Sequence, residues 1–389
     1  MREVTQPLPD PPTSEVAVDE RRSARRPTIE ALIGIRGIAA IWVLLEHFRF
    51  ALYDLFPATK HCVPWLDGAN LGIEIFFPLS GFVMSYMYAD RFRAGATNYA
   101  DYLVKRFARI YPVFLVTLLA FAALVGAAAV AHVSLNSSTR YTPLSFIGNL
   151  LLLQAAPGIP AWNPPAWSIS SEALAYVAFP LTLWLLARLT RPRSAAIGAL
   201  AWLIAGTAAM MTFRLVNPMW TSPGMMLLRI MTEFAAGAML WKAWSLAGEP
   251  QSPKWDVLAG GAFVLVVVAL PMLPQADSFA LVLTPVMAIF VVALAGARGP
   301  IRWLLSSKVA IFGGKISYSL YMVHFIVFAI VGKVLRWEPF ETSALPVRLA
   351  LIAFYFLTCI AIAIACYFLV EEPARRAIQR IAGRHRATR

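Results

Sequence analysis

Residues 29–51, IEALIGIRGIAAIWVLLEHFRFA, decide the fold class of this protein. An apolar run of about 20 residues is long enough for one helix to cross a lipid bilayer. Arg36 interrupts the run, and acidic and proline residues crowd the segment before it, so it lacks the composition of a cleavable signal peptide. We therefore expect residues 29–51 to form a retained membrane-spanning helix.

The composition of the whole chain points the same way. Of its 389 residues, 59% are hydrophobic and 14% are charged. Soluble domains carry roughly 45–50% apolar and about 25% charged residues. A chain with so few charged side chains cannot cover its own surface with polar groups, which excludes a soluble enzyme, a disordered protein and a secreted disulfide scaffold. The sequence predicts an all-α integral membrane protein.

Apolar runs of about 20 residues recur along the chain, and we count ten. They cover residues 29–51, 71–89, 110–133, 167–188, 195–214, 223–244, 256–273, 278–297, 315–335 and 346–370. A further apolar segment, residues 143–156, is short for a span, and we expect it to be re-entrant or interfacial. About ten transmembrane helices are predicted, which puts both ends of the chain on the same side of the membrane.

The formal net charge of +13 is distributed unevenly between the two sides. With ten spans, 25 of the 34 Lys and Arg residues fall on the side that holds both termini, and seven fall on the other side. Cytoplasmic loops carry an excess of Lys and Arg, so both termini are predicted to be cytoplasmic. The same rule accounts for the basic charge without a nucleic-acid partner. We divide the chain into a disordered basic tail (1–28), a transmembrane domain (29–372) and a second basic tail (373–389).

Two ionisable residues, Arg36 and His47, lie within the first span, and such residues are functional candidates inside a membrane. Their separation of 11 residues is close to three helical turns. Both side chains therefore project from nearly the same face, roughly 16 Å apart along the axis. This spacing suits a cation that holds one end of a long substrate and a base at the other end. A snorkelling arginine and an interfacial histidine are the alternative for either residue alone.

Ser168, Glu172 and Tyr176 form a polar stripe on the fourth span, because they are spaced four residues apart. By the span count, this helix begins on the outer side, where the first helix ends near His47. A carboxylate beside an imidazole fixes its tautomer and stabilises the imidazolium, so we expect Glu172 to orient His47 as a general base. The alternative is a helix start capped by Ser168, with Glu172 near the positive end of the helix dipole.

Two other polar groups have both a functional and a structural interpretation. In the ninth span, Tyr321 and His324 share one helical face with a serine, and hydrogen bonding between helices is the structural alternative. Arg106 and Arg109, beside a lysine at the cytoplasmic start of the third span, are placed to bind phosphate groups, although topology alone also puts cations there. No cysteine or histidine pair has the spacing of metal ligands, so no metal site is expected.

Together these motifs resemble the acyltransferase-3 family of polytopic membrane O-acyltransferases. The matching segments follow family order from about residue 29 to 376 and cover nearly the whole chain. They are Arg36 to His47 (Arg-x10-His), Gly72 to Phe82 (Gly-x-x-x-Phe-Phe-x-Leu-Ser-Gly-Phe), Arg106 to Pro112 (Arg-x-x-Arg-Ile-Tyr-Pro), Trp167 to Glu172 (Trp-Ser-Leu-Ser-x-Glu), Ser317 to His324 (Ser-Tyr-Ser-Leu-Tyr-x-x-His) and Glu371 to Arg376 (Glu-x-Pro-x-Arg-Arg). The chain is similar to the stand-alone form of the family, which lacks a fused SGNH-type hydrolase domain.

The resemblance implies transfer of an acyl group, acetyl by default, from acyl-CoA to a hydroxyl of a sugar, glycolipid or glycosylated metabolite. Acyl-CoA is then a co-substrate, and no permanently bound cofactor is expected. The expected roles are catalysis by His47 and Glu172, donor binding by Arg36, Arg106 and Arg109, and substrate binding by Ser168, Tyr321 and His324.

The acceptor is not specified by any motif, and the family acylates surface sugars, exopolysaccharides, peptidoglycan, lipochitooligosaccharides and macrolide antibiotics. The expected partners are acyl-CoA, a carbohydrate-containing or lipid-linked acceptor, and the bilayer of a bacterial inner (plasma) membrane. A glycan or lipid transporter or flippase without acyl-transfer chemistry is the alternative, although the two halves of the chain show no convincing repeat. A membrane scaffold or sensor is a further alternative, but it would not explain why Arg36, His47 and Glu172 are aligned.

Overall fold

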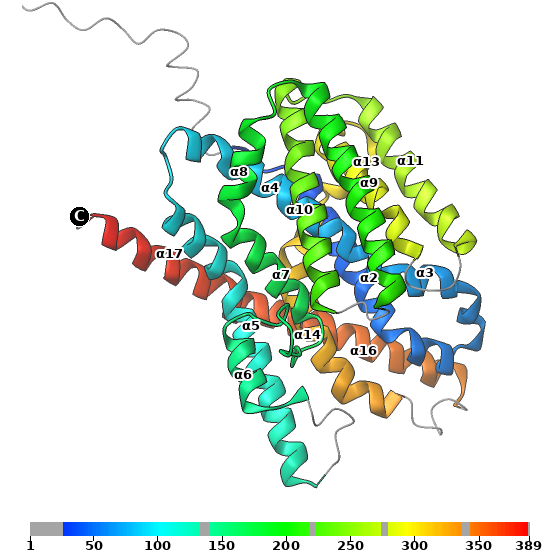
Figure 1. The fold of residues 1–389 in the computed structure, drawn as a ribbon. Coiled ribbons are helices and arrows are strands. Elements are labelled where there is room, and N and C mark those ends of the chain that lie inside the picture. Colours follow the sequence, from blue (N-terminus) through cyan, green and yellow to red (C-terminus); the bar gives the residue numbers. More distant parts are fainter. Residues whose placement is uncertain (1–25, 133–139, 218–221, 274–278, 336–342, 388–389) are drawn as a thin grey trace, which may run out of the picture.

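The computed structural model describes residues 26–132, 140–217, 222–273, 279–335 and 343–387, and within these ranges the chain is helical and has no strand (Figure 1). Among the described residues, helices form at all ten segments predicted to span the membrane, and the fourth segment contains two, which makes eleven. They are α2 (Glu30–Leu55), α4 (Ile73–Arg93), α5 (Tyr99–Val130), α7 (Ala166–Val177), α8 (Phe179–Ala187), α9 (Pro192–Val216), α10 (Pro223–Leu246), α11 (Pro253–Ala269), α12 (Thr284–Gly296), α14 (Lys308–Leu335) and α16 (Leu345–Cys366). Most of the predicted N-terminal tail, residues 1–25, lies outside the described residues.

Shorter elements connect these helices. They are η1 (Pro57–Cys62), α3 (Val63–Asp67), η2 (Gly68–Gly72), α6 (Pro143–Leu150), η4 (Leu270–Met272), η5 (Phe279–Leu283), α13 (Pro300–Leu305), the π-helical turn η6 (Tyr367–Glu371) and α17 (Glu372–Ala387). Most of the second predicted tail therefore forms a helix, which runs beside α5 away from the bundle (Figure 1).

Six of the described helices are long and apolar enough to cross a membrane. A seventh span results if α7 and α8, which meet at a bend of 53°, are counted as one. Helix α4 and helix α10 are also long, but they carry the charged residues Glu74, Arg229 and Glu233. Helix α6 has 8 residues, fewer than a span needs, in agreement with the expectation for residues 143–156. The predicted number of about ten spans and the cytoplasmic position of the termini stay predictions.

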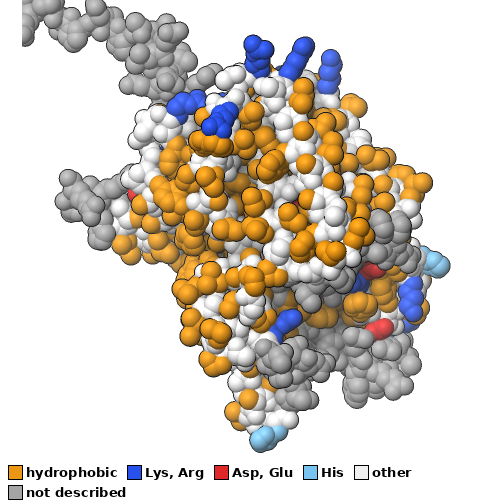
Figure 2. All heavy atoms as spheres, viewed as in Figure 1, with side chains coloured by type: hydrophobic (Ala, Val, Ile, Leu, Met, Phe, Trp, Pro, Cys, Tyr) orange, Lys and Arg blue, Asp and Glu red, His pale blue; other side chains and the backbone are white. Residues whose placement is uncertain are grey.

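The surface has the character of a protein immersed in lipid. Hydrophobic side chains cover most of the visible face, and Lys and Arg side chains gather at the end of the bundle where α8 ends and α9 begins (Figure 2). In this connection Arg188, Arg191 and Arg193 are exposed. An apolar belt that ends in a row of cations is typical of the interface between a membrane and water.

Helices α2 and α14 form the central pair of the bundle, and they run parallel in register. Gly37 packs against Gly313, and ten residues further along α2, His47 packs against His324. The backbones approach closely, because a Cβ atom added to Gly314 would lie 1.9 Å from the carbonyl oxygen of Ile33. Small residues at such a contact allow membrane helices to pack backbone to backbone. The parallel orientation agrees with the predicted first and ninth spans, both of which cross in the same direction.

Arg26 holds the segment before α2 against the helix bundle. Its guanidinium donates hydrogen bonds to Asp90 and Glu249 and lies 4.7 Å from the ring centroid of Tyr86. Burial by itself lowers the pKa of Arg26, but its hydrogen bonds and attraction to these two carboxylates outweigh burial and raise it. Tyr86 OH also donates to the carbonyl oxygen of Pro27 at 2.9 Å. The residues just before α2 are therefore held against the end of α4.

Candidate active site

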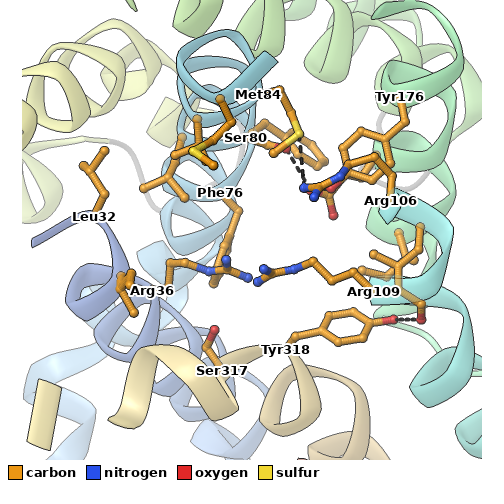
Figure 3. A pocket seen from close by; sticks show the side chains of 18 of the residues that line it. Leu32, Arg36, Phe76, Ser80, Met84, Arg106, Arg109, Tyr176, Ser317 and Tyr318 are labelled. Carbon is orange, nitrogen blue, oxygen red and sulfur yellow. Dashed lines mark hydrogen bonds between the residues drawn. The ribbon is translucent and has the colours of Figure 1, made fainter. Parts of the chain in front are cut away.

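A cavity of about 270 Å³ lies between α2, α4, α5, α7 and α14, and we call it the central cavity (Figure 3). Helix α4 lines it from Ile73 to Tyr88, which corresponds to about 22 Å at 1.5 Å per residue. At one end, Thr28 and Ile29 border it beside the segment held by Arg26. The polar and aromatic residues in its wall are Arg36, Phe76, Phe77, Ser80, Tyr86, Tyr88, Arg106, Arg109, Ser168, Glu172, Tyr176, Ser317, Tyr318 and Tyr321.

Two arginines from different helices point at one another across the central cavity. Arg36 extends from α2 and Arg109 from α5, and their guanidinium groups face each other (Figure 3). Neither forms an ion pair or a hydrogen bond with any residue that the structure describes, and Nε of Arg36 is buried without a partner there. Like charges repel at short range, and a buried charge is costly unless it is paired. We refer to Arg36 and Arg109 as the facing arginines.

Arg106 lies in the same wall, one turn before Arg109 on α5, but it has neutral partners. Its guanidinium donates to Tyr88 OH at 3.0 Å and lies 3.3 Å from the sulfur of Met84. The Tyr88 ring centroid is 5.1 Å from its central carbon, which adds a cation–π contact. The structure thus places all three predicted donor-binding arginines around one cavity.

Glu172 does not meet His47, contrary to the expectation from the sequence. Its Oε1 atom accepts hydrogen bonds from Ser80 Oγ at 2.8 Å and from Tyr176 OH at 2.6 Å. The carboxylate lines the central cavity, where it acts on Arg36 electrostatically. The structure therefore assigns Glu172 to the cavity that holds the arginines, not to the imidazole of His47.

The depth at which α7 begins explains this difference. The segment before α7 turns into the protein, where Asn163 Nδ2 donates to the carbonyl oxygen of Met322 at 2.9 Å and the carbonyl of Pro165 accepts from Tyr321 OH at 3.1 Å. Helix α7 consequently starts beside the middle of α14, whereas the span count had suggested a start level with His47. Its first turn lies beside Tyr321, and Glu172 is one turn further from the histidines.

His47 lies beyond the central cavity, and its environment determines its tautomer. Its Nδ1 is 2.9 Å from the carbonyl oxygen of Val43. A carbonyl oxygen only accepts hydrogen bonds, so Nδ1 carries the proton and Nε2 has the free lone pair. The backbone thereby performs the orienting role that we had expected of Glu172.

A second histidine lies against His47. The ring centroids of His47 and His324 are 5.0 Å apart in an edge-to-face arrangement. His324 is 1% exposed, and neither of its ring nitrogens makes a well-formed hydrogen bond with a described residue, although the carbonyls of Leu320 and Tyr321 are nearby. Two imidazoles thus lie together, a buried His324 and a His47 whose side chain is 25% exposed and whose Nε2 has a free lone pair.

Ser168 and Tyr321 separate the central cavity from the histidines. Their hydroxyl groups are 2.7 Å apart, both residues line the cavity, and the Tyr321 ring centroid is 5.9 Å from that of His324. The predicted residues therefore form one continuous path, which runs from the arginines through two hydroxyl groups to two imidazoles. A ligand that reaches this end of the cavity would meet the hydroxyl groups of Ser168 and Tyr321, which both also contact the carbonyl oxygen of Pro165, with the imidazoles beyond them.

This geometry agrees with a comparison of the sequence with known families. Residues 29–371 match the acyltransferase domain of the acyltransferase-3 family, which is well over half of the chain. The chain belongs to the acyltransferase-3 family. The match spans α2 to the end of η6, so this acyltransferase domain includes every helix that lines the central cavity.

Individual relatives of this acyltransferase are distant. It is 27% identical over 395 residues to the acyltransferase MdmB of Streptomyces mycarofaciens, with 92% of this chain and 93% of the relative covered. It is 23% identical over 337 residues to the putative O-acetyltransferase SACOL0978 of Staphylococcus aureus (strain COL), with 78% of this chain and 51% of the relative covered. No solved structure matches the chain.

Several residues of the acyltransferase cavity were given no role from the sequence. Tyr176 was noted in the polar stripe with Ser168 and Glu172, but its hydrogen bond to Glu172 was not predicted. Ser80 lies in the matched Leu-Ser-Gly-Phe segment, but no periodicity links it to Glu172, 92 residues away. Tyr88 is one of many aromatic residues near a helix end, and nothing in the sequence distinguishes it.

Proposed function

We propose that this protein transfers an acyl group, acetyl by default, from acyl-CoA to a hydroxyl of a sugar, glycolipid or glycosylated metabolite. The facing arginines carry the proposal: two guanidinium groups converge on a cavity without an ion-pair partner among the described residues. Such an arrangement suits an anion, and a guanidinium binds phosphate oxygens in a planar, bidentate manner. The family membership supplies the acyltransferase activity.

The shape of the central cavity supports a donor that is long, with an anionic and an uncharged end. Cations gather near its middle, whereas its far end is lined by Ile73, Phe77 and the hydroxyl groups of Ser168 and Tyr321. We place the phosphates of CoA at Arg36, Arg106 and Arg109 and the thioester at the two hydroxyl groups. The separation of Arg36 and His47, roughly 16 Å along α2 at 1.5 Å per residue, is on the order of the length of a phosphopantetheine arm.

In the proposed reaction His47 is the general base. Its Nε2 removes the proton of the acceptor hydroxyl, and the acceptor oxygen forms a bond to the carbonyl carbon of the thioester. The carbonyl oxygen becomes an oxyanion, which accepts hydrogen bonds from the hydroxyl groups of Ser168 or Tyr321. The C–S bond then breaks, and the CoA thiolate takes the proton from the imidazolium, which restores the neutral His47.

The other predicted residues take roles that follow from their contacts. His324 is placed to bind the acceptor beside His47, because its nitrogens are available on the far side of Tyr321. Glu172 does not orient His47 in this proposal. Instead, its carboxylate holds Ser80 and Tyr176 in place and adds negative charge near the arginines.

The setting of the reaction follows from the predicted orientation in a bacterial inner (plasma) membrane. With cytoplasmic termini, the end of the cavity near Thr28 faces the compartment that contains acyl-CoA, and His47 lies toward the outer side. The name of the staphylococcal relative, a putative O-acetyltransferase, supports acetyl as the group and oxygen as its acceptor.

Reconstituted acyl transfer with His47→Ala tests the proposal. Removing a general base lowers the rate by about 10²- to 10⁴-fold, so we expect kcat to fall by that factor at unchanged donor affinity. His61→Ala, which replaces an exposed histidine in η1, is the matched control and should retain wild-type activity. Glu172→Gln should change the donor KM more than kcat.

Two results would contradict the proposal. A wild-type kcat in His47→Ala would remove His47 as the base. Mass spectrometry of envelope glycans, lipids and secreted metabolites, with and without the gene, should show an added acyl mass; redistribution of an unmodified molecule would instead support a transporter or flippase.

A further inference from the structure

The Glu-x-Pro-x-Arg-Arg segment at the end of the acyltransferase domain has no place in the proposed reaction so far. It begins at Glu371, the last residue of the π-helical turn η6, and continues into α17. A π-helical turn inserts an extra residue into a helix, redirects the side chains that follow, and is often found at functional sites. The adjacent Glu371 and Glu372 lie where this turn ends and α17 begins, and they face different surroundings.

Glu371 points into the protein. It is 1% exposed, and its Oε2 accepts a hydrogen bond from Ser319 Oγ at 2.7 Å. Ser319 follows Tyr318, which lines the central cavity and donates from its OH to the carbonyl oxygen of Ile110. The carboxylate of Glu371 therefore lies directly behind the cavity wall, next to the segment of α5 that carries Arg109.

Turn η6, which ends at Glu371, packs against α5, the helix that carries Arg109, and against α14, which packs on α2 with Arg36. Glu172 is a second carboxylate at this site and lies in the wall of the central cavity. Neither carboxylate forms a direct ion pair with the facing arginines, so their negative charge acts through space and leaves the guanidinium groups accessible from the cavity.

Glu372 provides the contrast. Its carboxylate accepts hydrogen bonds from Arg375 and Arg376, one turn along α17, and these arginines are partly exposed. It therefore forms local surface ion pairs, whose contribution is generally small. The two neighbouring residues have the same side chain, but that of Glu371 is buried behind the cavity wall and that of Glu372 lies at the surface.

We propose that Glu371 is a positioning residue of the donor site: its carboxylate is a fixed counter-charge behind the cavity wall that competes with the CoA phosphates for the facing arginines and lowers their affinity for CoA enough for the product to leave. The inference rests on the proposed function of the cavity. A bound donor supplies phosphate charge to the same guanidinium groups, so Glu371 and the phosphates compete for one pair of cations. Removal of the carboxylate charge should then strengthen the binding of anions.

Glu371→Gln tests this in the purified full-length protein, with CoA as the probe in isothermal titration calorimetry. We expect the Kd for CoA to decrease by about 3- to 10-fold, the effect of one charge at moderate distance in a protein interior. Steady-state assays should show a lower donor KM and stronger product inhibition by CoA. Glu372→Gln, the matched control, should bind CoA as the wild type does, and Glu371→Asp should restore wild-type behaviour.

A lower Kd for CoA in Glu371→Gln cannot be explained by damage to the fold, because such damage weakens binding. An unchanged or higher Kd in Glu371→Gln, with wild-type protein that binds CoA, overturns this inference and leaves the proposed function intact. A wild-type protein that does not bind CoA overturns the proposed function itself.

If Glu371→Gln alone does not accumulate as folded protein, the charge-balanced variant Glu371→Gln/Arg109→Gln is measured instead. If Glu371 is the counter-charge of Arg109, the double variant should be as thermally stable as Arg109→Gln. A double variant that is as unstable as Glu371→Gln alone overturns the inference.

Discussion

Two groups of buried arginines within the described helices differ in how their charge is neutralised. In the buried charge cluster (Glu74, Arg229, Glu233 and Thr284), Arg229 donates to Glu74 and its Nε lies 3.8 Å from Glu233. Thr284 Oγ1 donates to the other oxygen of Glu74 at 3.0 Å. Arg36 and Arg109, by contrast, face one another across a cavity and have no ion pair in the described structure.

The comparison shows that an arginine inside a membrane protein does not by itself indicate a ligand site. Arg229 is 1% exposed and also lies over the ring of Trp167, with 5.0 Å between its central carbon and the ring centroid. Its charge is compensated by residues of the same chain, as expected for a structural ion pair. The facing arginines form no ion pair with a described residue, and the carboxylates of Glu172 and Glu371 lie near them without direct contact, so a ligand in the cavity can supply the missing direct partner.

The largest effect is expected from breaking the buried charge cluster. Arg229→Met leaves two buried carboxylates without their cation, and removal of one partner of a buried pair costs about 3–5 kcal/mol in the free energy of unfolding. The measurement is thermal or denaturant unfolding of the protein in lipid nanodiscs. Replacing all three charged residues (Glu74→Gln, Arg229→Met and Glu233→Gln) should recover most of the loss. A single variant as stable as the wild type would contradict the assignment of a structural role.

Substitution of a facing arginine should weaken ligand binding and leave the stability of the protein nearly unchanged. Arg36→Met or Arg109→Met removes one of two like charges, so we expect the free energy of unfolding to stay within about 1 kcal/mol of the wild type. Loss of hydrogen bonds to a charged phosphate should weaken CoA binding by about 10- to 100-fold. Calorimetric titration with CoA and unfolding of the same samples give both values. Large destabilisation with unchanged CoA affinity would place these residues with Arg229.

Arg106 is the intermediate case and should give the smallest effect. Its partners are the neutral Tyr88 hydroxyl and the Met84 sulfur, so Arg106→Met removes a cation from the cavity without exposing a buried counter-charge. We expect CoA affinity to fall by less than about 10-fold, with a change in unfolding free energy within about 1 kcal/mol. An affinity loss larger than that of Arg36→Met would show that Arg106 holds the main phosphate group.

Much of the architecture was predictable, because it depends on local and compositional rules. Membrane helices must satisfy their own backbone hydrogen bonds, so apolar runs of sufficient length indicate where helices form. Proline residues in the first turn mark the starts of α9, α10 and α11, where no backbone donor is lost, and Asn98 caps α5 by accepting from the amide of Asp101. The number of true spans was less certain, because polar residues in α4 and α10 lower their hydropathy.

The site was predictable only where its residues share a helix. Arg36 and His47 lie on α2, and their separation follows from helical geometry, as does the stripe of Ser168, Glu172 and Tyr176 on α7. Contacts between residues of different helices were not predictable, and the predicted pairing of Glu172 with His47 was wrong. That pairing required the depth at which α7 begins, and hydropathy does not specify depth.

The sequence by itself determined the helical class, the order of the helices and the spacing of polar residues along each one, because these follow from lipid solvation and a repeat of 3.6 residues per turn. The tertiary structure alone decided which of these residues meet. Backbone contact at Gly37, Gly313 and Gly314 sets α2 beside α14, and this contact brings His47 to His324. The inward turn before α7 places Glu172 with the arginines, since side-chain contacts across helices depend on packing between segments far apart in the chain.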